Sequence, residues 1–132
     1  MIIIDSNVWI YAESTNSDVH EKAVQKVSEL LDSDAFGINS IIVSEVFYKL
    51  SKIIGDKEAR VRMKHILEHP FVQWLDFSID TATKAMDLSF KTKVRINDTM
   101  IAAQAMSFKA SVFTDNIKDF GKIGGLKVMP LR

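Results

Sequence analysis

Short apolar runs alternate with longer amphipathic stretches along this chain. The runs lie at residues 2–4 and 35–38, and strand-like segments with some polar residues lie at 72–77, 111–114 and 126–129; polar or turn-forming residues follow all five. Short continuous apolar runs are typical of strands buried on both faces of a parallel sheet. We therefore predict that these five segments are the strands of one sheet.

Between the runs, apolar residues recur every three or four positions, which predicts helices. The expected helices cover residues 8–12, about 18–31, 40–54, 56–68, 80–88 and 99–108. Ser17 or Asp18, Ser40 and Asp80 are the predicted N-caps. Strands that alternate with helices predict an α/β fold. We expect one domain over residues 1–132, a three-layer α/β/α sandwich around a central, mainly parallel sheet of four to five strands.

Composition narrows the class of protein. The chain has 132 residues, of which 47% are hydrophobic and 26% charged, as in soluble globular proteins. It contains no cysteine, which excludes disulfides and thiol catalysis. No apolar run approaches the roughly 20 residues of a membrane span, and the N-terminal MIII lacks the basic start of a signal peptide. We expect a cytoplasmic protein without a membrane partner.

Charge is balanced overall, with 17 basic and 17 acidic residues, but it is not evenly distributed. One basic cluster runs from Lys49 to Lys64, and a second contains Lys91, Lys93 and Arg95. Solvated helix and loop surfaces are the more frequent explanation of such clusters. The functional alternative is that they contact phosphates beside an acidic site.

Four acidic residues stand beside strong structural signals, namely Asp5, Glu45, Asp98 and Asp115. Asp5 and Asp115 follow apolar runs, where a turn or cap role is a reasonable alternative. Asp98 begins a helix, where the helix dipole alone favours an acid. Glu45 precedes Lys49 by four residues, so a surface ion pair would also explain it. Carboxyl ends of parallel strands gather at one edge, so these acids are candidates for a single site.

If the four acids converge, their chemistry is restricted. Carboxylate oxygens suit Mg²⁺ or Mn²⁺ rather than zinc or copper, and such sites support phosphoryl chemistry. The histidines at 20, 65 and 69 lack the pattern of a zinc protease motif, and we interpret them as surface or partly buried residues.

Four motifs in order resemble the PIN domain family, and the small size resembles its VapC-type toxin ribonucleases. They are IIIDSNVWIYA at the N-terminus, S-x-x-x-S-E at 40–45, NDTMIAAQA at 97–105 and FTDNxxDF at 113–120. Each motif is weak by itself, whereas the ordered set is specific and spans the chain.

The resemblance implies an endoribonuclease that depends on Mg²⁺ or Mn²⁺ and leaves 5′-phosphate and 3′-hydroxyl ends. Asp5 and Asp98 would be the main metal ligands, with Glu45 bound directly or through water. The fourth ligand is expected to be Asp115, with Asn116 and Asp119 as alternatives. Ser6, Asn7, Thr114 and Asn116 would support the ligands by hydrogen bonds. The resemblance also implies an RNA substrate, a homodimer and a VapB-type antitoxin.

Other protein classes fit less well. A receiver domain needs an acidic pair after its first strand and a lysine after its last core strand, where this chain has Asp5-Ser6-Asn7 and Thr114-Asp115-Asn116. A haloacid-dehalogenase-like phosphatase needs a second Asp at the position of Asn7. The glycine-rich turn of dinucleotide-binding domains is also missing. A PIN scaffold without activity and a PIN nuclease of RNA processing remain as alternatives.

Overall fold

The computed structural model describes residues 1–15 and 17–132. Its strands are β1 (Ile2–Ile4), β2 (Phe36–Ile38), β3 (Val72–Trp74), β4 (Ser111–Thr114) and β5 (Lys127–Pro130). Its helices are α1 (Ser6–Glu13), α2 (His20–Ser33), α3 (Ser40–Ile54), α4 (Asp56–Leu67), α5 (Ile79–Thr92), α6 (Ile96–Ser107) and α7 (Ile117–Phe120).

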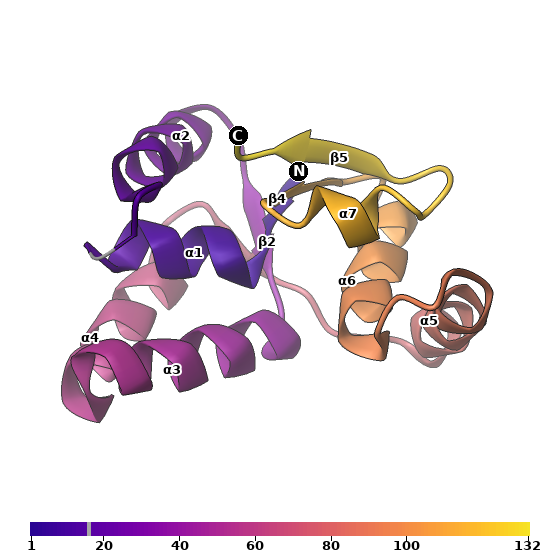
Figure 1. The fold of residues 1–132 in the computed structure, drawn as a ribbon, viewed down its shortest axis with the longest axis horizontal. Helices are drawn as coiled ribbons and strands as arrows, with labels where there is room; N and C mark the ends of the chain where they lie inside the picture. Colours follow the sequence, from indigo (N-terminus) through magenta and orange to yellow (C-terminus); the bar gives the residue numbers. More distant parts are fainter. Residues whose placement is uncertain (16) are drawn as a thin grey trace.

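All five strands pair in parallel, in the order β3-β2-β1-β4-β5. Helices α1 to α4 lie on one side of the sheet, and α5 and α6 lie on the other (Figure 1). The predicted three-layer α/β/α arrangement is therefore confirmed, with the upper end of the predicted strand number. Strand order changes direction between β1 and β4, and such a switch point is where open α/β sheets bind ligands.

The three inner strands β1, β2 and β4 fit the predicted pattern of buried strands, whereas the edge strands β3 and β5 are largely exposed. Ile3 and Ile4 of β1 and Phe113 of β4 are buried at the centre of the sheet. Helix α6 contacts β4, and its small residues Ala102 and Ala105 are fully buried. Because alanine has little side-chain volume, the helix axis can approach the sheet closely. Across the described residues, no helix combines the length and the apolar character that crossing a membrane requires.

Several predicted helix starts are wrong by one or a few residues. Asn39, not Ser40, caps α3 by accepting a hydrogen bond from the Ile42 amide at 2.9 Å. Ser78, not Asp80, caps α5, and Asp80 lies in the first turn instead. Helix α2 begins at His20 without a side-chain cap. For α3 and α5, neighbouring polar residues satisfy the same sequence rule, and backbone geometry decides between them.

Candidate active site

Asp5 lies at the switch point, directly after β1. Its amide donates to the Phe113 carbonyl of β4 at 2.9 Å, so the sheet ladder itself fixes the residue. Its carboxylate caps α1 by accepting from the Ser6 amide at 2.8 Å. This explains why α1 begins at Ser6, two residues earlier than expected. The side chain is almost fully buried, with the residue 3% exposed.

Polar residues at the ends of β1 and β4 hold the Asp5 carboxylate in a fixed orientation. The Thr114 hydroxyl donates to Asp5 Oδ2 at 2.7 Å, and Asn7 Nδ2 donates to the same oxygen at 3.2 Å. Thr114 in turn accepts from the Asn116 amide at 2.9 Å. Asn7, Thr114 and Asn116 therefore lie where the sequence predicts supporting hydrogen-bond partners.

Glu45 and Asp98 reach this edge from helices on opposite sides of the sheet. Glu45 is on the first half of α3, and the Ser6 hydroxyl donates to its Oε1 at 3.1 Å. Asp98 is in the first turn of α6 and is 3% exposed. The structure thus brings three of the four predicted acids to one place, although their role as metal ligands stays a prediction.

Arg95 joins these two acids. Its Nη2 lies 2.7 Å from Glu45 Oε2, and its Nε lies 3.1 Å from Asp98 Oδ2. Nη2 also donates to Asp98 Oδ1 at 3.3 Å, so the guanidinium contacts both oxygens of that carboxylate. From the sequence, Arg95 belongs to a basic cluster for which a solvated surface is the favoured explanation and phosphate contact the alternative. Its pairing with a helix residue 50 positions away is not visible there.

A buried pair of amides ties α6 to the start of α3. Asn39 Nδ2 donates to Gln104 Oε1 at 2.8 Å, while Asn39 Oδ1 caps α3. Gln104 Nε2 donates to the carbonyls of Leu75 and Asp76 at 3.3 and 3.2 Å. The pair therefore sets the position of α3 relative to α6, and with it that of Glu45 relative to Asp98. Sequence reasoning missed this role, although Gln104 interrupts the apolar run of α6.

Burial and mutual repulsion make the site unfavourable for negative charge. Burial raises the pKa of Asp5 to about 6, in spite of the hydrogen bonds from Thr114 and Ser6, and the charges of Asp98 and Glu45 add to the rise. Burial also raises the pKa of Asp98, against the lowering effect of Arg95, with smaller contributions from Glu45 and Asp119. Among the residues that the structure describes, Asp5 thus has no positively charged partner, whereas Asp98 has Arg95.

Asp115, the fourth predicted acid, faces Arg132. Nε and Nη2 of Arg132 donate to its two carboxylate oxygens at 3.1 and 3.0 Å. Its amide donates to Asn7 Oδ1, so its backbone belongs to the site while its carboxylate forms an ion pair at the rim. Asp119, one of the alternatives, accepts from Asn116 Nδ2 at 3.2 Å and affects the pKa of Asp98.

The donors present suit Mg²⁺ or Mn²⁺. They are carboxylate and carboxamide oxygens, and the buried negative charge on Asp5 is what a hard cation would compensate. Across the described chain, no set of three or more carboxylate or imidazole side chains is grouped closely enough to hold a metal as it stands. Mg²⁺ usually needs one or two carboxylates, with waters completing its octahedron. The chemistry of these donors therefore fits such an ion, and the assignment of Asp5 and Asp98 as its ligands stays a prediction.

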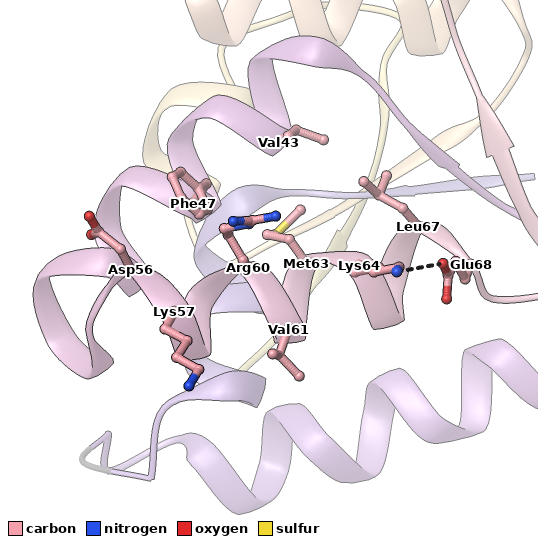
Figure 2. A pocket seen from close by; sticks show the side chains of 10 residues that line it. All are labelled: Val43, Phe47, Asp56, Lys57, Arg60, Val61, Met63, Lys64, Leu67 and Glu68. Carbon is pink, nitrogen blue, oxygen red and sulfur yellow. Dashed lines mark ion pairs between the residues drawn. The ribbon is translucent and has the colours of Figure 1, made fainter.

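A groove lies between α3 and α4, and the four predicted acids do not line it. Figure 2 shows this groove, which has a volume of about 780 Å³. Apolar side chains line it, namely Val43, Phe47, Val61, Met63 and Leu67. Lys57, Arg60 and Lys64 from the first basic cluster also line it, together with Asp56 and Glu68. These three bases of that cluster are thus on a groove wall.

The parallel sheet order and the acids near its switch point define an α/β/α domain with a candidate acidic site. The PIN domain model matches residues 2–126, so the chain belongs to the PIN domain family. The family inferred from the four motifs is therefore confirmed.

Individual relatives are distant but cover nearly the full length. The chain is 23% identical over 129 residues to ribonuclease VapC2 of Rickettsia felis, covering 94% of this chain and 92% of that protein. The structure of VapBC2 from Rickettsia felis bound to a promoter DNA fragment matches with a TM-score of 0.79, 23% identity and 98% coverage of both chains. Mycobacterium tuberculosis VapC20, a toxin that cleaves the sarcin-ricin loop, matches with a TM-score of 0.78, 15% identity and coverage of 98% and 100%.

Proposed function

We propose that this protein is a metal-dependent endoribonuclease and the toxin of a VapBC-type toxin–antitoxin pair. The observation that carries the proposal is the convergence of Asp5, Glu45 and Asp98, from three separate segments, at the switch point of the sheet. Burying acids together is costly unless a cation compensates them. The PIN family and the likeness to ribonuclease VapC2 support RNA as the substrate.

In this proposal Asp5 and Asp98 hold a Mg²⁺ or Mn²⁺ ion, and Glu45 completes the site directly or through water. When bound, such an ion stabilises negative charge on a phosphodiester and lowers the pKa of water. Thr114 and Asn7 fix the direction of the Asp5 oxygens, as supporting hydrogen bonds do in metal sites generally. Ser6 positions Glu45, and Asn116 holds Thr114 and Asp119. Hydrolysis would leave 5′-phosphate and 3′-hydroxyl ends.

Binding partners form a second part of the proposal. Solved structures with the same fold include VapBC2 of Rickettsia felis on promoter DNA and VapBC-1 of nontypeable Haemophilus influenzae. By this likeness we propose a VapB-type antitoxin for this chain and a homodimer as its own assembly. The α3–α4 groove, with its apolar lining and basic wall, is the surface we assign to an amphipathic acidic segment of the antitoxin.

Cleavage of RNA by the purified protein tests the catalytic proposal. Activity should require Mg²⁺ or Mn²⁺ and stop with EDTA. Asp5→Asn and Asp98→Asn should each lower the rate by more than about a hundredfold, because loss of a ligand exceeds the 10- to 100-fold effect of losing a supporting partner. Asp80→Asn, which changes an exposed acid in the first turn of α5, is the matched control and should retain wild-type activity.

Two outcomes would reject the proposal. Cleavage that persists in both variants without added metal would exclude the acidic site as the catalytic one. RNA binding without cleavage and without affinity for divalent cations would favour a PIN scaffold that binds RNA or a protein partner.

A further inference from the structure

Arg95 occupies the two carboxylates that the helices bring to the site. We propose that Arg95 is an internal counter-cation that competes with the divalent metal for Glu45 and Asp98 and must release them before the metal binds. The inference rests on the proposed function, because it takes the same acids as metal ligands. It assigns to Arg95 a positioning role that neither motif nor family predicts.

The geometry shows why the two cations compete. The guanidinium contacts Glu45 Oε2 and both oxygens of Asp98, at distances from 2.7 to 3.3 Å. A metal held by Asp98 would lie within a few ångströms of this fixed positive charge. At that separation the repulsion between a divalent ion and a guanidinium is strong wherever water is excluded. The metal and the paired Arg95 therefore cannot share the Asp98 carboxylate at full affinity.

The placement of Arg95 also allows its release. Its side chain is 60% exposed, although the Asp98 side chain that it contacts is only 4% exposed. Arg95 is the N-cap residue of α6 but makes no side-chain cap hydrogen bond, so the helix start does not depend on its side chain. Moving the guanidinium into water would thus break two ion pairs and leave the backbone in place. The pair with Glu45 lies at the surface, where ion pairs are weak. Asp98 is buried, so its release by Arg95 is favourable only because the metal takes over the compensation of its charge.

The chain offers two matched controls. Arg62 also joins two acids, Glu13 and Glu58, at 3.0 and 3.1 Å, but on α4 away from these carboxylates. Lys93 precedes Arg95 by two residues, and its ammonium lies over the Phe90 ring at 4.8 Å instead of on a carboxylate. Arg62→Gln therefore tests the loss of a similar double ion pair, and Lys93→Gln tests the loss of a nearby charge alone.

Calorimetric titration of the metal-free protein with Mn²⁺, without RNA, tests the proposal. Arg95→Gln should bind Mn²⁺ about three- to tenfold more tightly than wild type, the size expected when one or two exposed pairs no longer compete. The Mn²⁺ affinity of Arg95→Lys should lie between those of wild type and Arg95→Gln, because lysine keeps the charge but not the forked contact. Both control variants should stay within about twofold of wild type. Thermal unfolding of Arg95→Gln should show a lower midpoint in the metal-free protein and a wild-type midpoint at saturating Mn²⁺.

Equal or weaker Mn²⁺ binding by Arg95→Gln would overturn the proposal. If wild type also binds Mn²⁺ and cleaves RNA in that case, the proposed function stands and Arg95 is excluded as a competitor. If wild type binds Mn²⁺ but cleaves no RNA, the proposed function fails while the affinity ratio still decides the role of Arg95. Absence of Mn²⁺ binding by every variant would overturn both.

Discussion

The acidic site has two halves that handle negative charge differently. The strand half contains Asp5, Ser6, Asn7 and Thr114, and the helix half contains Glu45, Arg95 and Asp98. In the strand half, neutral hydrogen-bond donors surround a buried carboxylate whose pKa rises to about 6. In the helix half, an exposed arginine compensates two acids.

This difference separates orientation from charge compensation. Hydrogen bonds from Thr114 and Asn7 fix where the Asp5 oxygens point, but they leave the negative charge without a positive partner. The ion pairs of Arg95 do the reverse, because its single positive charge partly compensates Glu45 and Asp98 through a side chain that is largely exposed. A divalent cation would supply positive charge beside Asp5 in the strand half. In the helix half it would replace Arg95 as the positive charge beside Glu45 and Asp98.

Breaking the link between α3 and α6 should have the largest effect on stability. Gln104→Met keeps the volume but leaves Asn39 Nδ2 and the carbonyls of Leu75 and Asp76 without their buried partner. Each unpaired buried group costs about 1–3 kcal/mol and three groups lose a partner here, so we expect a loss of at least about 3 kcal/mol in the free energy of unfolding.

Chemical denaturation measures this loss. Gln25→Met, a change on the exposed surface of α2, is the control and should stay within about 0.5 kcal/mol of wild type. A Gln104→Met protein as stable as the control would mean that the amide pair does not hold the two helices.

The buried Asp5 of the strand half should make the stability of the metal-free protein depend on pH. The pKa of Asp5 is about 6 in the folded protein against an ordinary value of 3.8, so between these values the folded state binds more protons than the unfolded state. The stability that this raised pKa contributes is therefore fully present below pH 3.8 and is lost as the pH rises through about 6. The shift corresponds to at most about 3 kcal/mol.

Asp5→Asn removes this titration. The stability of the variant relative to wild type should therefore rise between pH 4 and pH 7, as measured by urea unfolding with EDTA. Saturating Mn²⁺ should abolish the wild-type loss, because the ion favours the charged carboxylate. Parallel pH profiles for the two proteins would mean that burial does not raise the pKa of Asp5.

A smaller effect distinguishes the candidates for the fourth acid. Asp115 is neutralised by Arg132 at the rim, whereas Asp119 is linked through Asn116 to Thr114 and affects Asp98. We expect Asp119→Asn to lower RNA cleavage about tenfold, in the range of supporting partners of metal ligands. Asp115→Asn should lower it less than about threefold. The reverse order would restore Asp115 as the fourth acid of the site.

The sequence predicts the framework of this site better than its contacts. The strands and the order of their acids follow from apolar runs, because buried parallel strands need nothing else to be recognised. Helix starts are less certain, since Asn39 and Ser40 both satisfy the rule for caps. The four-residue helix α7 is too short to have a recognisable period, and the sequence prediction omits it.

Long-range polar partners are what the sequence does not reveal. Arg95 pairs with Glu45 across 50 residues, and Gln104 pairs with Asn39 across 65. Neither pairing has a local signal, because both depend on how α3 and α6 meet. The motif around Asp115 likewise does not tell which of its acids faces the site, because Arg132, which binds the Asp115 carboxylate, lies 17 residues later in the chain.

Anomalous scattering from crystals soaked in Mn²⁺ tests the central claim most directly. We expect a manganese peak coordinated by the carboxylates of Asp5 and Asp98, with the Arg95 guanidinium no longer in contact with Asp98. A protein that cleaves RNA with Mn²⁺ but shows no peak between these two acids, or one elsewhere, would contradict it.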